Sequence, residues 1–240
     1  MRVLVPAETP ASPMLVGARV ELDDREEHHL RVRRVSEGAE VEVLDGAGFR
    51  GVGRLLRSGK RWVVEIRQLG HQPPPAALTL AVATGDRDRF SWMVEKAVEL
   101  GVTAIVPLGT SRSAGVATGV KERHLPGLRR QAREAVKQCG AAWASEVQAL
   151  LPLETFLARP GARVRWLADQ GGNPAAGVLD QSSASIVVGP EGGLTEEERA
   201  AVLGAGFQPV SLSRQTLRFE TAAIAAAAAA VLARIRGGYG

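Results

Sequence analysis

Three consecutive prolines, Pro73, Pro74 and Pro75, constrain the architecture of this chain more than any other feature of its sequence. Because proline fixes φ and has no backbone N–H to donate, such a run cannot lie inside a helix or a central strand, and it favours a stiff, extended connection. The residue patterns on its two sides differ. We therefore predict two domains, residues 1–70 and 78–240, joined by a proline linker over residues 71–77.

Before the linker, the sequence has the pattern of short β-strands. Apolar and polar residues alternate within residues 41–44 and 62–66, and turn-forming residues at 45–48 and 58–60 separate three strand-like segments. Closely spaced short strands of this kind are typical of small barrels. The first domain is therefore predicted to be a small β-barrel or a β-rich module.

After the linker, strand-like apolar segments alternate with helical patterns. Thr195 followed by Glu198 has the spacing of a capping box, and Gly101 and Gly140 are placed to end two helices. Repeated strand–helix units predict an α/β domain with a parallel sheet, whose ligands bind at the carboxyl ends of the strands. We expect strands at residues 78–84, 104–108, 164–168, 186–188 and 208–212, and helices at residues 86–100, 122–139 and 220–236 and after Thr195.

Composition narrows the class of protein only in part. The net charge is +4, from 30 Lys and Arg residues against 26 Asp and Glu residues, which permits a nucleic-acid partner without demonstrating one. A single cysteine, Cys139, excludes an internal disulfide framework and a multi-cysteine zinc site. No stretch reaches the roughly 18 apolar residues of a membrane span, and the N-terminus lacks the layout of a signal peptide. We therefore expect a cytoplasmic protein with no membrane segment and no metal.

Two of the predicted strand-end loops concentrate residues suited to ligand binding. Residues 189–194 are Gly-Pro-Glu-Gly-Gly-Leu, and glycines, which lack Cβ atoms, let a ligand approach the backbone. An ordinary strand-to-helix turn would also carry glycines. Residues 213–221 bring two arginines, a carboxylate and hydroxyl groups to the start of a helix, but a helix cap with solvated arginines explains that segment equally well. The residues alone leave both alternatives open.

Several common nucleotide-binding and catalytic motifs are missing from the sequence. No strand-like segment is followed by G-x-G-x-x-G, and the chain has neither a G-x-x-x-x-G-K-[S/T] phosphate loop nor a G-x-S-x-G nucleophile elbow. Its four histidines show no metal-ligand spacing. A dinucleotide-binding Rossmann protein is therefore disfavoured.

Segments along nearly the whole chain carry a resemblance to one known family. They are residues 29–34 and 45–48, residues 89–102, residues 134–140, and residues 189–195 followed by residues 217–222. The last two resemble the paired end motifs of the 16S ribosomal RNA uracil-N3 methyltransferases, a branch of the SPOUT superfamily. Residues 89–102 are similar to that family's first helix, which ends in E-L-G-V, and residues 134–140 are similar to its E-A-x-x-Q-S/C-G helix end. The first two resemble its PUA-like RNA-binding barrel.

This resemblance implies an α/β fold in which a small PUA-like β-barrel precedes a parallel-sheet SPOUT methyltransferase domain with a C-terminal trefoil knot. It implies a homodimer that uses S-adenosyl-L-methionine to methylate N3 of a specific uridine in 16S ribosomal RNA, either naked or in the small ribosomal subunit. By position, the RNA-binding residues would be Arg31, Arg33, Arg34 and Lys96. The cofactor-binding residues would be Leu167, Ala168, Val188, Gly189, Pro190, Gly192, Gly193, Leu212, Ser213, Thr216, Leu217, Arg218 and Thr221.

The implied reaction sets requirements for the catalytic residues. Uracil N3 attacks poorly until its proton leaves, and that departure spreads negative charge over O2 and O4, so the site needs a cation beside the carbonyls and a proton acceptor. Arg218 is the candidate cation. Glu220 would accept the proton or orient Arg218, and orientation is favoured because a helix N-terminus stabilises a charged carboxylate. Glu191 is the second candidate base.

Three positions depart from the family pattern. Ser213 stands where the family has glycine, Ala141 where arginine is common, and Phe219 where a smaller residue is usual. Other functions remain open: a SPOUT methyltransferase acting on ribose 2′-oxygens, a non-catalytic RNA-binding ribosome-assembly factor, and a generic nucleotide-binding α/β protein. The predicted barrel argues against the first, and the intact segments 189–193 and 218–221 argue against the second.

Overall fold

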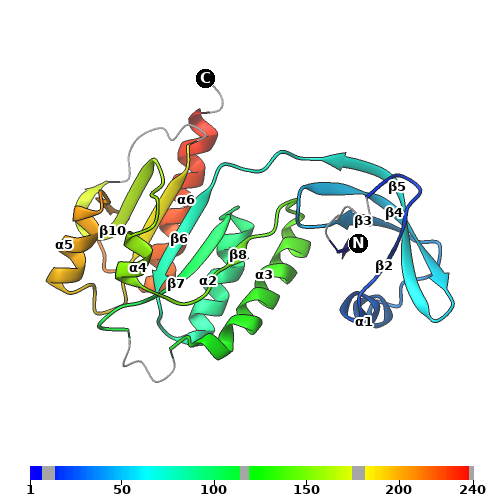
Figure 1. Cartoon of the computed structure of the whole chain (residues 1–240), viewed down its shortest axis with the longest axis horizontal. Helices are drawn as coiled ribbons and strands as arrows, with labels where there is room; N and C mark the ends of the chain where they lie inside the picture. The colour runs from blue at the N-terminus through cyan, green and yellow to red at the C-terminus, as the bar shows by residue number, and fades with distance from the viewer. Residues whose placement is uncertain (7–13, 114–118, 175–181, 238–240) are drawn as a thin grey trace. The chain divides into compact units, whose positions relative to one another are not determined.

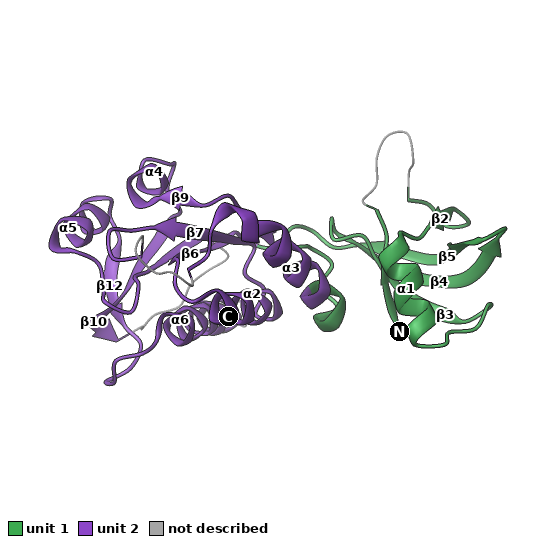
Figure 2. Ribbon diagram, turned by 90° about the horizontal axis from the view of Figure 1, so that it is seen from below, with its two compact units in different colours: residues 1–75, 136–144 green, residues 76–135, 145–240 purple. Residues whose placement is uncertain are grey.

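Figure 1 shows the computed structural model of the chain, which describes residues 1–6, 14–113, 119–174 and 182–237. The chain forms two compact units (Figure 2): unit 1 comprises residues 1–75 and 136–144, and unit 2 comprises residues 76–135 and 145–240. The boundary after Pro75 falls inside the predicted linker. Residues 136–144, which the prediction had placed in the second domain, belong to unit 1.

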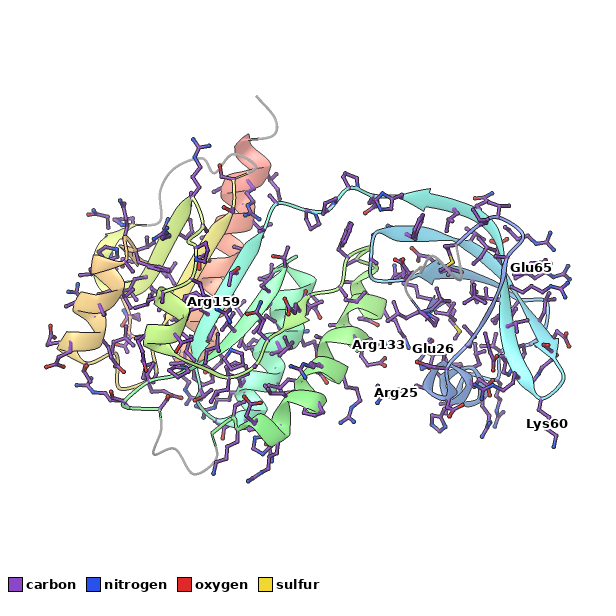
Figure 3. The ribbon with its side chains drawn as sticks, in the orientation of Figure 1. Arg25, Glu26, Lys60, Glu65, Arg133 and Arg159 are labelled. Atoms are coloured by element: carbon purple, nitrogen blue, oxygen red, sulfur yellow. The ribbon has the colours of Figure 1, made fainter. Side chains whose placement is uncertain are left out.

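Unit 1 is built on a five-stranded sheet. Its elements are β1 (Arg2–Leu4), β2 (Arg19–Glu21), α1 (Asp24–Val32), β3 (Glu40–Leu44), β4 (Phe49–Ser58) and β5 (Arg61–His71). The strand order is β1-β3-β4-β5-β2, with β1 parallel to β3 and the other neighbours antiparallel. The three strand-like segments predicted from alternation are strands, and Lys60 lies at the tip of the long β4–β5 hairpin (Figure 3).

Helix α1 was not predicted, although the sequence signals where it starts. Asp23 is its N-cap, and the Asp23 carboxylate accepts a hydrogen bond from the backbone N–H of Glu26 at 2.8 Å. Acidic side chains fill the first turn, where the helix dipole stabilises them. Leu30 is the helix's one buried apolar side chain. One buried apolar residue is too few to produce a helical period, which is why the pattern analysis missed this element.

Residues 136–144 are held in unit 1 by polar contacts. The Lys137 ammonium lies 2.9 Å from a carboxylate oxygen of Glu26 on α1, and both side chains are buried. The Arg2 guanidinium donates to the carbonyl oxygens of Lys137 and Gln138, at 3.2 and 2.6 Å. These partners are more than a hundred residues apart in the chain, so no local pattern predicts this part of unit 1.

Unit 2 contains a seven-stranded sheet. Its strands are β6 (Leu78–Ala83), β7 (Ala104–Gly109), β8 (Glu146–Val147), β9 (Leu151–Pro152), β10 (Val164–Pro174), β11 (Ala184–Val188) and β12 (Gln208–Ser211). The order is β12-β10-β11-β6-β7-β8, with β9 beside β7, and every pairing is parallel, which confirms the predicted parallel sheet. Ala168 of β10 pairs on one side with Val188, at the end of β11, and on the other with Val210, near the end of β12.

Helices cover both faces of the unit 2 sheet, as a parallel sheet requires. The helices after the linker are α2 (Arg87–Glu99), η1 (Glu122–His124), α3 (Leu125–Cys139, of which residues 136–139 belong to unit 1), α4 (Leu153–Leu157), α5 (Glu196–Gly204) and α6 (Phe219–Gly237). Helices α2 and α6 cover one face, and α4 and α5 cover the other (Figure 2). No helix in the described part of the chain is long and apolar enough to cross a membrane.

The helix ends predicted after the proline linker are confirmed. Asp86 caps α2, and its side chain accepts hydrogen bonds from two backbone N–H groups of the first turn. Thr195 and Glu198 form the reciprocal capping box of α5. Gly101 and Gly140 follow α2 and α3 with φ of +81° and +80°. The predicted helix at residues 122–139 begins with one 3-10 turn, and β8, β9 and α4 are too short for any period to reveal them.

Strand β10 departs most from its predicted length, because it continues from Ala168 to Pro174. Its register against β12 shifts between Ala168 and Asn173. Gly172 lies in this shift, and a Cβ atom there would sit 2.4 Å from the carbonyl carbon of Pro209. Only glycine allows the two backbones to come so close. The apolar run ends at Ala168, so periodicity carries no signal for the extension.

Candidate active site

A cavity of about 290 Å³ lies within unit 2, where β11 and β12 end beside residues 167–170 of β10. This is where a parallel sheet is expected to bind its ligands. Residues from the segments 167–170, 188–194 and 212–217 line it, together with the start of α6. The topology therefore brings together three of the strand-end loops that the sequence indicated.

The loop after β11 is shaped by its glycines. Gly193 has φ of +71°, and its N–H donates to the carbonyl oxygen of Pro190 at 2.8 Å, which closes a tight turn. A Cβ atom on Gly189 would meet the Leu194 side chain at 3.3 Å. The loop leads directly into the capping box of α5, where the Glu198 carboxylate accepts from the Thr195 N–H at 2.9 Å. Glycine here keeps the backbone accessible from the cavity.

The loop after β12 forms a turn at Ser213, the position where the family has glycine. The Ser213 hydroxyl accepts a hydrogen bond from the Gln215 N–H at 3.0 Å, so a polar side chain stabilises the turn. Gln170, at the end of the 167–170 segment, donates to the carbonyl oxygen of Arg214 at 3.1 Å. The Thr216 hydroxyl donates to the Gln170 side-chain oxygen at 3.4 Å. The two loops are therefore joined to each other beside the cavity.

Asp169 and Arg199 also line the cavity, and sequence reasoning did not select either residue. The Asp169 carboxylate accepts from the Arg199 guanidinium at 2.7 Å and from the Gly171 N–H at 2.9 Å. Burial alone would raise the pKa of Asp169, but these hydrogen bonds and the Arg199 charge hold the pKa of that carboxyl below its usual value. Its place directly after Ala168, where the predicted strand ended, was the available signal.

Most of the predicted cofactor-binding residues line the cavity. Gly192, Arg218 and Thr221 do not, but each is adjacent in the chain to a residue that does. The predicted residues that line it are Leu167, Ala168, Val188, Gly189, Pro190, Gly193, Leu212, Ser213, Thr216 and Leu217.

The three candidate catalytic residues lie in different environments. Glu191 is exposed and lines the cavity, and Arg218 is exposed and follows the lining residue Leu217 in the chain. Glu220, in the first turn of α6, is buried, with only 8% of its surface exposed. The Arg89 guanidinium, which sequence reasoning did not select, lies 4.0 Å from Glu220 Oε1, and Glu220 Oε2 is buried without a hydrogen-bond partner among the described residues. Arg89, not Arg218, is therefore the cation beside this carboxylate.

Phe219, the third departure from the family pattern, has a packing role. It is buried, its ring stacks on Phe90 of α2 with centroids 6.2 Å apart, and it lines the cavity. A Cβ atom on Gly85 would lie 2.5 Å from this ring. The larger side chain is thus accommodated by a glycine at the end of β6. Ala141 is half-buried in unit 1, and nothing in the structure explains the absence of arginine there.

The candidate RNA-binding residues separate into two kinds. Arg31, Arg33 and Arg34 are exposed in unit 1 at the end of α1, and Arg34 has φ of +51°. Lys96, on α2 of unit 2, donates to Glu95 at 2.7 Å and to Glu99 at 2.8 Å, and these hydrogen bonds raise its pKa. No group of three or more His, Cys, Asp or Glu side chains within the described ranges could hold a metal ion.

The cavity lining suits a ligand that joins an apolar ring to polar and positively charged groups. Leu167, Val188, Leu217 and Phe219 provide apolar walls, and the glycine loop provides accessible backbone. The charged lining residues are Asp169, Glu191 and Arg199. Their two carboxylates and one guanidinium leave an excess of negative charge. S-Adenosylmethionine, with its adenine ring, ribose hydroxyls, amino-acid group and sulfonium, fits such a site.

Comparisons with known proteins agree with this geometry. The RNA methyltransferase domain family matches residues 72–231, and the RNA methyltransferase PUA domain family matches residues 22–66. Ribosomal RNA small subunit methyltransferase E of Synechocystis is 33% identical over 226 residues, which cover 88% of this chain and 72% of that protein. The enzyme of the same name from Aquifex aeolicus is 30% identical over 210 residues, covering 85% and 90%.

A solved structure matches both units. The crystal structure of ribosomal RNA small subunit methyltransferase E from Neisseria gonorrhoeae bound to S-adenosyl methionine has a TM-score of 0.83 and 29% identity, covering 95% of each chain. The domain matches, the relatives and this structure agree with the resemblance of the 189–195 and 217–222 motifs. The chain therefore belongs to the ribosomal RNA small subunit methyltransferase E family, with a PUA-like domain and a SPOUT methyltransferase domain.

Proposed function

We propose that this protein transfers the methyl group of S-adenosylmethionine to N3 of a specific uridine in 16S ribosomal RNA. The observation that carries the proposal is the cavity formed by the three strand-end loops, in a chain whose relatives are small-subunit ribosomal RNA methyltransferases. A relative with 29% identity was crystallised with S-adenosyl methionine bound. Ribosomal RNA as substrate also makes the cytoplasm the proposed site of action.

The cofactor is proposed to lie against the glycine loop and the apolar walls of the cavity. When bound, it supplies a methyl group on a sulfonium sulfur. Backbone groups of 189–193 and of Leu212 to Leu217 would hold it, and Asp169 and Glu191 would favour its positive charge. The tie between Gln170 and the 213–216 turn keeps the cavity's two walls in fixed positions, which reduces the entropic cost of binding.

Arg218 is proposed as the cation that stabilises the uracil during methylation. Loss of the N3 proton spreads negative charge over the uracil carbonyl oxygens, and a guanidinium can donate hydrogen bonds to them. Arg218 is exposed next to cavity residue Leu217, and no carboxylate of the described segments pairs with it. Its donors are therefore available to a substrate.

Glu220 is proposed as the proton acceptor. Its Oε2 atom is buried and has no hydrogen-bond partner within the described residues, so it has a lone pair directed at no other group. Arg89, 4.0 Å from Oε1, would hold the carboxylate in place. Glu191 remains the second candidate, because it lines the cavity but is exposed to solvent. Geometry close to the reacting nitrogen decides such a role before acidity does.

A homodimer formed through α6 is part of the proposal. Leu232 and Ile235, three residues apart and therefore neighbours on the helix surface, are 55% and 49% exposed. Helix α2 packs against α6 and exposes Trp92. Apolar side chains exposed together mark interaction surfaces. Light scattering of the purified protein should give twice the mass of one chain, and the Leu232→Glu, Ile235→Glu variant should give the mass of one.

The test of the function is methylation of 16S ribosomal RNA or small subunits from cells that lack this activity, followed by nucleoside mass spectrometry. We expect 3-methyluridine, formed only when S-adenosylmethionine is present, and at least a hundredfold slower formation by Arg218→Ala at normal RNA binding. A 2′-O-methylated nucleoside would assign the protein to the other chemistry. RNA binding with neither cofactor binding nor product would support the assembly-factor alternative.

A further inference from the structure

The turn that follows β7 contacts the 189–194 loop, although it lies outside the three segments that form the cavity. It is formed by residues 110–113, directly after β7. The Thr110 N–H donates to the Ser113 hydroxyl oxygen at 2.9 Å, and the Ser113 hydroxyl and Ser113 N–H each approach the Thr110 carbonyl oxygen at 3.1 Å. Thr110 and Ser113 are buried. The turn is therefore closed by its own hydrogen bonds and holds its two central residues outward.

Arg112, one of the two central residues of this turn, makes the first contact with the 189–194 loop. Its guanidinium donates from Nη1 to the carbonyl oxygen of Gly192 and, at 3.3 Å, to that of Leu194. A Cβ atom on Gly192 would lie 3.4 Å from Arg112 Cδ, so the arginine stem lies against that glycine. Hydrogen bonds from a charged donor are about twice as strong as neutral ones. One side chain therefore fixes the orientation of two peptide groups in the loop.

The second contact is made by the backbone of Ser111. Its N–H donates to Glu198 Oε1 at 2.7 Å, while Glu198 Oε2 accepts from the Thr195 N–H in the capping box. Burial would raise the pKa of Glu198, but the Ser111 and Thr195 N–H groups and the nearby Arg112 charge lower it, so the carboxylate stays ionised at neutral pH. The 110–113 turn thus holds both ends of the segment from Gly192 to Glu198.

We infer that Arg112 is a positioning residue for the cofactor: by holding the Gly192 and Leu194 carbonyls it keeps the 189–194 loop in the shape that binds S-adenosylmethionine. This inference rests on the proposed function. The two carbonyls accept hydrogen bonds from Arg112, and the cavity-lining residues Gly189, Glu191, Gly193 and Leu194 belong to the same loop. Without Arg112 the loop has more conformations, and cofactor binding must overcome the cost of ordering it.

The experiment compares the full-length wild type with Arg112→Ala and Arg112→Lys. The matched control is Arg159→Ala, because Arg159 is also exposed and hydrogen-bonded, to Gln148, but does not line the cavity (Figure 3). Four quantities are measured for each: the Kd for S-adenosylmethionine by calorimetry, the unfolding temperature without cofactor, and the KM for S-adenosylmethionine and the kcat of methyl transfer at saturating RNA.

We expect Arg112→Ala to raise the Kd and the KM for S-adenosylmethionine by about tenfold to thirtyfold, with kcat at saturating cofactor within about threefold of the wild type. The cofactor-free unfolding temperature should stay close to that of Arg159→Ala. Arg112→Lys should recover part of the affinity, because an ammonium can donate to the same carbonyls but is a compact, more strongly hydrated charge than a guanidinium.

Other outcomes overturn the inference. If Arg112→Ala binds S-adenosylmethionine like the wild type but binds RNA more weakly, Arg112 is an RNA contact. If it lowers the unfolding temperature well below the control and Arg112→Lys restores neither stability nor affinity, its role is only structural. If the wild type itself does not bind S-adenosylmethionine, the proposed function fails, and that failure is visible before any variant is measured.

Discussion

The two units place their ion pairs differently. In unit 1, Lys137 and Glu26 form an ion pair in which both side chains are buried. The pair joins segments that lie more than a hundred residues apart in the chain. In unit 2, Asp169 and Arg199 form a pair that lines a cavity and keeps part of its surface exposed. A buried ion pair is compatible with a stable fold only while both charged partners are present, because removing one leaves a buried charge uncompensated. A charged side chain that lines a cavity can also interact with a bound ligand. The first pair is therefore a structural element and the second is available for function.

The largest expected effect concerns the buried pair. Lys137→Met should destabilise the protein by about 3 to 5 kcal/mol, because it leaves the Glu26 carboxylate buried without its ammonium partner. Guanidinium denaturation followed by circular dichroism measures the change. The double variant Lys137→Met, Glu26→Gln serves as the control and should recover a large share of the loss. A cost below about 1 kcal/mol for the single variant would mean that water reaches this pair.

The next largest effect concerns the close approach of backbones beside the cavity. Gly172→Ala should destabilise unit 2 by about 1 to 3 kcal/mol and weaken S-adenosylmethionine binding, because its Cβ would collide with Pro209. Gly171→Ala is the matched control, since a Cβ there meets only an Asp169 oxygen, at 3.4 Å. Thermal unfolding and calorimetry measure both properties. Equal behaviour of the two variants would show that β10 can shift away from β12 at little cost.

A third prediction compares exposed cations from the two units. Arg31→Ala should weaken binding of a 16S ribosomal RNA fragment by threefold to tenfold, roughly 1 kcal/mol, and lower the slope of log Kd against log salt by about 1, as loss of one phosphate contact would. Lys96→Ala should change both quantities less, because Glu95 and Glu99 already neutralise the Lys96 ammonium. The reverse ranking would place the RNA on unit 2 instead.

The units also differ in how far their sequences predicted them. In unit 2 the strands around Leu80, Val106 and Val187 are apolar runs buried on both faces, so composition alone marks them. In unit 1 the three-residue strands β1 and β2 are too short for alternation to be visible. Residues 136–144 joined unit 1 through the Lys137 and Arg2 contacts, which depend on the folded chain and not on any local pattern.

The candidate site shows the same division between local and spatial information. Residues 189–193 are a contiguous motif, and all of them except Gly192 line the cavity. Arg89, Arg112 and Arg199 approach the site from three other segments, and each is one arginine among many in a chain with few lysines. Nothing in the residue type or its neighbours separates these arginines from solvated ones. They come close to one another only because β6, β7 and β11, the strands that precede these three segments, are neighbours in one parallel sheet.

The smallest predicted effect tests whether the Asp169–Arg199 pair contributes to stability at all. The folded-state pKa of Asp169 is lowered, so its stabilising contribution is fully present above its unfolded pKa of about 3.9 and is lost as pH falls through the lower, folded value. Because Arg199 is partly exposed, solvent screening limits the contribution to about 0.5 to 1 kcal/mol. The difference in unfolding free energy between wild type and Asp169→Asn should therefore be constant from pH 5 to 7 and shrink below pH 4, as measured by urea denaturation at each pH.

In an Arg199→Gln background the same substitution should cost less, and its acid dependence should move toward the ordinary pKa of an aspartate. A difference that does not change with pH would mean that the carboxylate gains nothing from Arg199 in the folded protein, and the pair would then have to be explained by the ligand that it faces.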